Sequence, residues 1–149
     1  MPVTDIARTT VVTVGPAASV ADVVRTMREE SVGSVVVAED GAPVGYVTDR
    51  DLAMAVLEAG FDAEATPISE QLRGEPVTID ADAGVYELVE LLSEKGVRRV
   101  PVVDDGELVG IVSLSDVVVL LGMELQHLAT AIRASSPAYE RGGPDYYRS

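Results

Sequence analysis

The chain has 149 residues, of which 47% are hydrophobic and only 4% aromatic, so any core must consist mainly of aliphatic side chains. Acidic residues outnumber basic ones by 25 to 11, which gives a formal net charge of −14. This balance argues against nucleic acid and anionic membranes as partners, because both attract clustered Lys and Arg. The chain has no cysteine and one histidine, His127, which excludes disulfides and thiolate sites and disfavours zinc.

The N-terminus has neither a basic segment nor an apolar one of the kind that forms a secretory signal, and no uninterrupted apolar run reaches membrane-spanning length. We therefore expect a soluble cytoplasmic protein. Lys95 is the only lysine, so the other ten basic residues are arginine. An acidic, lysine-poor composition favours adaptation to high salt, in which charge repulsion is screened. A GC-rich genome is the alternative source of the same bias.

The sequence contains an internal repeat. A shift of 65 residues places Val12–Ala53 on Val77–Val118 without a gap. VTVGPAASVADVV then aligns with VTIDADAGVYELV, and VGSVVVAEDGAPVGYVTDRD aligns with VRRVPVVDDGELVGIVSLSD. Because turns, helix caps and apolar positions recur in the same order, we interpret the chain as a duplicated unit.

Each unit is predicted to run strand, helix, strand, strand, helix. Short extended segments at Val11–Val14 and Val77–Ile79 come first. A capping box beginning at Ser19 predicts the first helix, and Gly84 begins its weaker copy. Two β-branched runs follow in each unit, joined by Asp-Gly at positions 40–41 and 105–106, which is a strong hairpin signal.

The last helix of each unit, expected to begin near Asp49 or Ser115, is apolar on nearly every side. Such a helix must be covered on every side, and one unit is too small to cover it. The two units are therefore expected to pack together. A second copy of the chain is expected to cover the remainder, as a homodimer through the last helices of each repeat.

The predicted boundaries are residues 5–60 for the first unit, 61–75 for a connector with a helical turn near Ile68, 76–134 for the second unit and 135–149 for a tail. The tail holds Tyr139, Tyr146 and Tyr147. It is either a frayed terminus or an arm whose aromatic rings dock on a neighbouring subunit.

Two motifs at equivalent places resemble a known family. GYVTDRD at 45–51 and GIVSLSD at 110–116 resemble the G-h-x-[ST]-x-x-D signature of CBS domains, in which h is hydrophobic. GVRRVPVVD at 96–104 resembles the second strand of such a domain. The resemblance covers about residues 5–125, and segment 50–72 is similar to stand-alone CBS-pair proteins without a catalytic domain. It implies an α/β (α+β) fold of tandem β-α-β-β-α repeats, a Bateman module, related by a pseudo-twofold axis.

The resemblance implies a regulatory module that binds AMP, ADP, ATP or S-adenosylmethionine in two clefts, each lined by both repeats, with no cofactor required. A carboxylate in the first turn of a helix can accept hydrogen bonds from both ribose hydroxyls. The hydroxyl three residues earlier and the helix N-terminal amides can donate to phosphate. Apolar strand residues can enclose the adenine.

The implied site residues fall into two unequal clefts. The first combines Thr48, Arg50 and Asp51 with Val77, Val97, Arg98 and Arg99. The second combines Ser113, Ser115 and Asp116 with Val12, Val32, Gly33 and Ser34. Because the first cleft has three arginines available for phosphate, we expect it to prefer the more highly phosphorylated ligand. The second is expected to hold a mononucleotide, a nucleoside or nothing.

Structural roles compete with these assignments. Asp51 and Asp116 are also typical helix caps, and Gly45 and Gly110 are more typical of close backbone packing than of ligand contact. The neighbouring residues 98 and 99 point to opposite faces of a strand, so only one arginine can face a given cleft. Acidic pairs beside the two hairpin turns are more typical of solvated turns than of a metal site, and His127 is predicted to lie at the surface or an interface.

The sequence offers no nucleophile paired with a base, so we expect no enzymatic activity. The favoured hypothesis is a nucleotide-sensing module that acts on an effector protein which the sequence does not identify. The alternative is a ligand-free dimeric scaffold whose last helix and tail make the contacts. A sensor should be stabilised by its ligand, whereas a scaffold should not.

Overall fold

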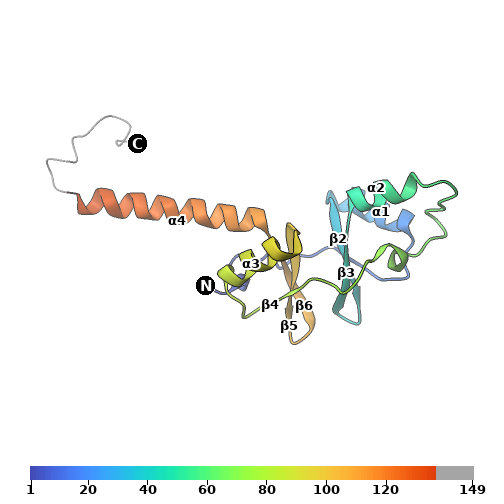
Figure 1. Ribbon diagram of the computed structural model, residues 1–149, viewed down its shortest axis with the longest axis horizontal. Coiled ribbons are helices and arrows are strands. Elements are labelled where there is room, and N and C mark those ends of the chain that lie inside the picture. Colours follow the sequence, from blue (N-terminus) through green and yellow to red (C-terminus); the bar gives the residue numbers. More distant parts are fainter. Residues whose placement is uncertain (137–149) are drawn as a thin grey trace. The chain divides into compact units, whose positions relative to one another are not determined.

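The structure, a computed structural model, describes residues 1–136; the tyrosines predicted to mark the tail lie outside these residues (Figure 1). The chain divides into two compact units, Met1–Leu114 and Ser115–Ser149, and each is described by itself. The first unit holds both sheets, three α-helices and two short 3-10 helices, and the described part of the second unit is almost entirely the helix that follows Leu114.

Each repeat has the predicted order of elements and forms its own three-stranded sheet. The first strand pairs parallel with the second, and the second pairs antiparallel with the third, with a register shift at the same place in both sheets. The first repeat comprises β1 (Thr13–Val14), α1 (Val20–Glu30), β2 (Ser34–Glu39), β3 (Ala42–Thr48) and α2 (Asp49–Val56). The second comprises β4 (Ile79–Asp80), α3 (Val85–Lys95), β5 (Arg99–Asp104), β6 (Glu107–Ser113) and α4 (Leu114–Ser135).

Both hairpins turn at the predicted Asp-Gly pairs. The φ angles are 51° at Asp40 and 81° at Gly41, and 49° and 82° at Asp105 and Gly106. Positive φ at both central residues defines the tight turn whose twist matches that of paired strands. Asp and Gly adopt positive φ more readily than most residues, so the two Asp-Gly pairs determine where both hairpins turn.

Helix α1 begins where predicted, after Ser19. The Ser19 hydroxyl accepts a hydrogen bond from the Asp22 amide at 3.1 Å, and the helix ends at Ser31, where φ is 55°. We expect Ser19→Ala to lower the free energy of unfolding by about 1 kcal/mol, because one amide of the first turn loses its partner. Urea unfolding measures the change. Ser93→Ala, inside α3, is the control and should stay within about 0.5 kcal/mol of wild type; an equal loss in both variants would contradict the capping role.

The core of the first repeat is aliphatic. Helices α1 and α2 bury Val23 and Leu52 against Val35 and Val47 of the sheet, together with Ile68 from the connector. Ile68 belongs to a short 3-10 helix, η2 (Ile68–Gln71), close to the predicted helical turn. The connector therefore completes the core of the first repeat.

The segment that precedes each repeat packs on the other repeat. Residues 66–73 precede the second repeat, yet the Ile68 amide donates to the Ala18 carbonyl at 2.7 Å. Residues 1–8, which include the 3-10 helix η1 (Val3–Asp5), precede the first repeat, yet the Val3 amide donates to the Ala83 carbonyl at 2.8 Å. Val3 and Ile68 are both fully buried. This reciprocal exchange was not predicted from the sequence.

A surface ion pair also ties the connector to α1. The Arg25 guanidinium contacts Asp22 at 2.6 Å and also contacts Glu64 of the connector. The hydrogen bond and charge of Glu64, followed by those of Asp22, raise the pKa of Arg25 above its usual value. All three groups are exposed, so solvent screens this contact and the buried Ile68 contributes more to the attachment.

Helix α4 runs for 22 residues and exposes most of its apolar side chains. It is long and apolar enough to cross a membrane by length and composition, which our reading of the sequence did not anticipate. A single helix of this kind is weak evidence for a membrane span. Asp116, Glu124 and Arg133 are charged positions along it.

Candidate ligand pocket

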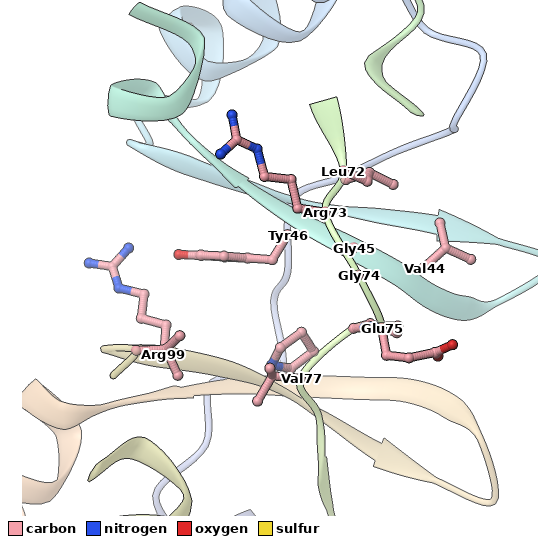
Figure 2. Close-up of a pocket in the computed structure, with 12 residues that line it drawn as sticks. Val44, Gly45, Tyr46, Leu72, Arg73, Gly74, Glu75, Val77 and Arg99 are labelled. Carbon is pink, nitrogen blue, oxygen red and sulfur yellow. The ribbon is translucent and has the colours of Figure 1, made fainter. Parts of the chain in front are cut away.

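A pocket of about 190 Å³ lies within the first unit, between residues of both repeats and the connector (Figure 2). Strand β3 contributes Val44 and Tyr46, β5 contributes Arg99, and the connector contributes Arg73 and Glu75. The volume is smaller than the ~300–1,000 Å³ typical of enclosed ligand sites. A nucleotide-sized ligand would therefore extend beyond it.

Successive side chains of β3 point to opposite faces of the strand, and this alternation determines which of them reach the pocket. Val47 and Pro43 are buried on one face, whereas Val44, Tyr46 and Thr48 are half-buried on the other. Val44 and Tyr46 line the pocket, and Thr48 follows on the same face. Figure 2 shows the Tyr46 ring extended between strands, with its hydroxyl on the side where the Arg99 guanidinium lies.

Polar side chains from both repeats meet beside the pocket. Arg99, at the start of β5, donates a hydrogen bond of 3.1 Å to the hydroxyl of Ser34, the equivalent position in the first repeat. Ser34 is the cross-strand partner of Thr48, and Arg99 is that of Ser113. The four residues therefore form one row across the two repeats. Three of them carry a hydroxyl and one carries a guanidinium, a set suited to anionic oxygen.

The connector supplies charged side chains on either side of a glycine. Arg73 and Glu75 flank Gly74, whose φ of 67° favours glycine. With Arg99, the pocket therefore combines two cations, one carboxylate and the phenol of Tyr46. Guanidinium groups can bind phosphate or carboxylate, a carboxylate can accept hydrogen bonds from hydroxyls, and an aromatic ring can stack on a base.

Several residues predicted for the first cleft line this pocket. Val77, Val97 and Arg99 are among its lining residues. Of the adjacent arginines, Arg99 is the one that reaches the pocket, whereas the Arg98 carbonyl accepts the amide of Leu114 at 2.8 Å.

The remaining residues of that prediction form the start of α2. The Thr48 amide donates to Asp51 Oδ2 at 3.1 Å, and the Asp51 amide donates to the Thr48 hydroxyl at 3.2 Å. This reciprocal pair is a capping box, so both residues have a structural role. The exposed Arg50 follows Asp49, whose carboxylate accepts the Arg50 amide at 2.8 Å. The role of Asp51 toward ribose stays a prediction.

The residues predicted for the second cleft belong to two units. Val12 and Val32 pack against the core of the first repeat, and the Gly33 carbonyl accepts the amide of Asp49 at 2.9 Å. Ser115 and Asp116 lie in the first turn of α4, in the second unit. How these two residues combine with the first repeat stays a prediction. Among residues 1–136, no cluster of three or more His, Asp or Glu side chains is placed to hold a metal ion.

Comparison with known proteins gives the family. The model of the CBS domain matches twice, over residues 3–58 and 69–122. The chain belongs to the CBS-domain family. Both matches begin within the exchanged segments: the first includes Val3, whereas the second begins one residue after Ile68.

Curated relatives and a solved structure agree with this assignment. An uncharacterized protein of Methanopyrus kandleri is 38% identical over 116 residues, which are 76% of this chain and 59% of that protein. The CBS domain-containing protein YhcV of Bacillus subtilis is 35% identical over 117 residues, covering 78% of this chain and 83% of the relative. A solved CBS-domain pair in complex with methylthioadenosine and S-adenosyl-L-methionine has a TM-score of 0.72 at 25% identity, with 83% and 98% of the two chains covered.

Three polar pocket residues, Tyr46, Arg73 and Glu75, were missed by sequence reasoning. Tyr46 stands where the second repeat has Ile111, so the aromatic ring is specific to one repeat. Arg73 lies in the connector, which was read only as a linker. The signal for Tyr46 was present, since it lies inside the GYVTDRD motif. The signal for Arg73 was absent, because its position depends on the connector crossing to the first repeat.

Proposed function

We propose that this CBS-domain pair is a regulatory module that binds an adenosine-containing ligand, an adenine nucleotide or S-adenosylmethionine, in the pocket of Tyr46 and Arg99. The observation that carries the proposal is the meeting of these residues from different repeats, together with Arg73, on one cavity. CBS pairs are generally regulatory modules without catalysis. The adenosine derivatives bound by the solved CBS pair support this ligand class.

The chemistry of the pocket suits both ends of such a ligand. The Tyr46 ring and the aliphatic Val77 and Val97 offer a surface for adenine. Arg73 and Arg99 provide charge-assisted hydrogen bonds to phosphate or to a ligand carboxylate. Glu75 can accept hydrogen bonds from ribose hydroxyls or balance a cationic ligand.

Regulation would follow from bridging the repeats. The repeats already touch through the Arg99–Ser34 hydrogen bond and through the Leu108 amide, which donates to the Gly41 carbonyl at 2.9 Å. A ligand that contacts Tyr46 of one repeat and Arg99 of the other favours arrangements in which both contacts form. A change in the arrangement of the two repeats would also change the surface that they present to an effector protein.

A thermal-shift series tests the proposal. AMP, ADP, ATP and S-adenosylmethionine are added at fixed protein concentration, in low and multimolar KCl. At a concentration 100 times its dissociation constant, a ligand should raise Tm by about 5–10 °C. Arg99→Ala should weaken that ligand by roughly 10- to 100-fold, because a charge-assisted hydrogen bond is lost.

Two further variants distinguish the loss of a ligand contact from effects that are unrelated to the pocket. Arg28→Ala removes an exposed arginine of α1 and should leave the ligand shift unchanged. Asp51→Asn retains a capping acceptor for the Thr48 amide but removes the carboxylate, so it separates a ribose contact from the cap. If no ligand shifts the Tm of the folded protein, or if Arg28→Ala and Arg99→Ala weaken binding equally, the proposal is wrong. A ligand-free scaffold would then be the better reading.

A further inference from the structure

The two exchanged segments follow the same path at their start. Each forms one isolated β-bridge with the opposite repeat, Pro2 with Gly84 and Pro67 with Ser19. The residue after each proline is fully buried, and its amide donates a hydrogen bond to the opposite repeat. Residues that are 65 positions apart in the two segments therefore occupy equivalent places.

The equivalence ends at the next contact. Arg8 and Ile111 of β6 exchange two backbone hydrogen bonds of 2.9 Å, so the N-terminal segment lies directly against the edge of β6. The equivalent residues are Arg73 of the connector and Tyr46 of β3. Within residues 1–136, these two exchange no backbone hydrogen bond. The connector therefore stands off from the edge of β3, at the pocket that Arg73 and Tyr46 line.

The edge of β3 could nevertheless form this bridge. Ile111 is paired with Pro101, which has no amide to donate, and turns its own amide and carbonyl outward to Arg8. Tyr46 is paired with Val36 in the same register, and the Val36 amide donates away from β3. The amide and carbonyl of Tyr46 therefore also point outward, toward the connector.

A difference in side-chain size explains why only one repeat forms the bridge. A Cβ atom at Gly110 would lie 2.8 Å from the Arg8 carbonyl oxygen and 3.5 Å from the Ala7 Cβ. At Gly45, where the connector passes β3, the three atoms nearest to such a Cβ all belong to the Leu72 side chain (Figure 2). Leu72 is the equivalent of Ala7, and its larger side chain occupies the place that backbone takes at Gly110.

Gly74 gives the connector the freedom to change its path. This glycine follows Arg73 and has a φ of 67°, whereas the equivalent Thr9 does not have a positive φ. Glycine adopts negative φ about as readily as positive φ, so the connector can take the path of the N-terminal segment without strain at this residue. The obstacle to that path is the side chain of Leu72.

We infer that Leu72 is a positioning residue that holds the connector off the edge of β3 and keeps the pocket open. Without the leucine side chain, Arg73 would pair with Tyr46, and the connector would occupy space that a ligand needs. For its effect on ligand binding the inference rests on the proposed function. The position of the connector itself can be measured without a ligand.

Amide hydrogen exchange of the ligand-free full chain, resolved by NMR, measures that position. In wild type, the Tyr46 amide should exchange at least about 10-fold faster than the Ile111 amide relative to their intrinsic rates, because only the second is hydrogen-bonded. In Leu72→Ala, exchange at Tyr46 should become at least about 10-fold slower, although lost apolar contact lowers the urea midpoint. Lost packing alone would not slow exchange in a less stable protein.

Three further variants test the role of side-chain size. Leu72→Met keeps a similar volume and should leave exchange at Tyr46 unchanged. Val14→Ala truncates another partly buried side chain on the same core and should lower stability without slowing exchange at Tyr46. Ala7→Leu places the larger side chain in the N-terminal segment and should accelerate exchange at Ile111 by at least about 10-fold.

The thermal-shift series distinguishes this inference from the proposed function. A ligand that stabilises wild type should bind Leu72→Ala at least about 10-fold more weakly, because the pocket is closed. If no ligand stabilises wild type but amide exchange changes as expected, the proposed function is wrong and the role of Leu72 stands.

Four exchange results would overturn the inference. These are equal protection of Tyr46 and Ile111 in wild type, no slowing at Tyr46 in Leu72→Ala, the same slowing in Leu72→Met, and unchanged exchange at Ile111 in Ala7→Leu. Circular dichroism establishes that each variant is folded. If Leu72→Ala is unfolded, Leu72→Val takes its place and should slow exchange at Tyr46 in the same direction.

Discussion

Ile68→Ala should lower the free energy of unfolding by about 3–4 kcal/mol. Ile68 is fully buried and belongs to the same core as Val23, Val35 and Leu52, although it lies in the connector. Truncation removes apolar contact and leaves a cavity that the surrounding strands and helices fill only in part. The change should appear in urea unfolding as a lower midpoint with an unchanged slope.

Leu57→Ala provides the control, because Leu57 is 81% exposed at the end of α2. It should change stability by less than about 0.5 kcal/mol. Both variants and wild type need the same protein concentration, since self-association would otherwise shift the apparent stability. If Ile68→Ala were as stable as Leu57→Ala, the connector would not be part of the core.

Gly110→Ala should release the N-terminal segment from the second repeat. A Cβ atom at Gly110 would lie 2.8 Å from the Arg8 carbonyl oxygen, a distance that requires the backbone to move. Arg8 and Ile111 exchange two backbone hydrogen bonds of 2.9 Å at this place, and the buried Val3 belongs to the same segment. Losing these contacts should cost about 3–5 kcal/mol. Amide exchange at Val3, Arg8 and Ile111 should accelerate.

Gly45→Ala is the matched substitution at the equivalent position of the first repeat. Its Cβ would clash with the terminal carbons of Leu72, which form a side-chain obstacle that rotation can partly relieve. We therefore expect a smaller loss, about 1–2 kcal/mol. Equal losses in both variants, with unchanged amide exchange at Val3, would contradict the role of Gly110 in holding the N-terminal segment.

Sequence reasoning succeeded where the determinant is local. The turns at Asp40 and Asp105 need residues that tolerate positive φ, and the cap at Ser19 needs a hydroxyl three residues before an amide, so short patterns suffice. The tandem CBS fold followed from two motifs in register, and the family match confirms it. Arg99 was assigned to a cleft by the resemblance to CBS domains, and it lines the pocket.

The exchanged segments could not be predicted in the same way. Val3 is buried by residues about 80 positions further along the chain, and its neighbours in sequence show no periodicity that reveals burial. For the same reason Arg73 was read as part of a linker. Thr48 and Asp51 illustrate the opposite difficulty, because one motif serves as a helix cap and also resembles a ligand contact.

The exchange also sets an order of events during synthesis. The first repeat is complete once residue 73 has left the ribosome, because its covering segment follows it directly. Residues 1–8, although made before the first repeat, have no docking site until Ala83 and Ile111 have emerged. Val3 therefore stays exposed to solvent until the residues that bury it have been translated. This segment is made before both repeats but is buried after the first, and an unfinished chain exposes both the segment and the incomplete second core to other nascent proteins.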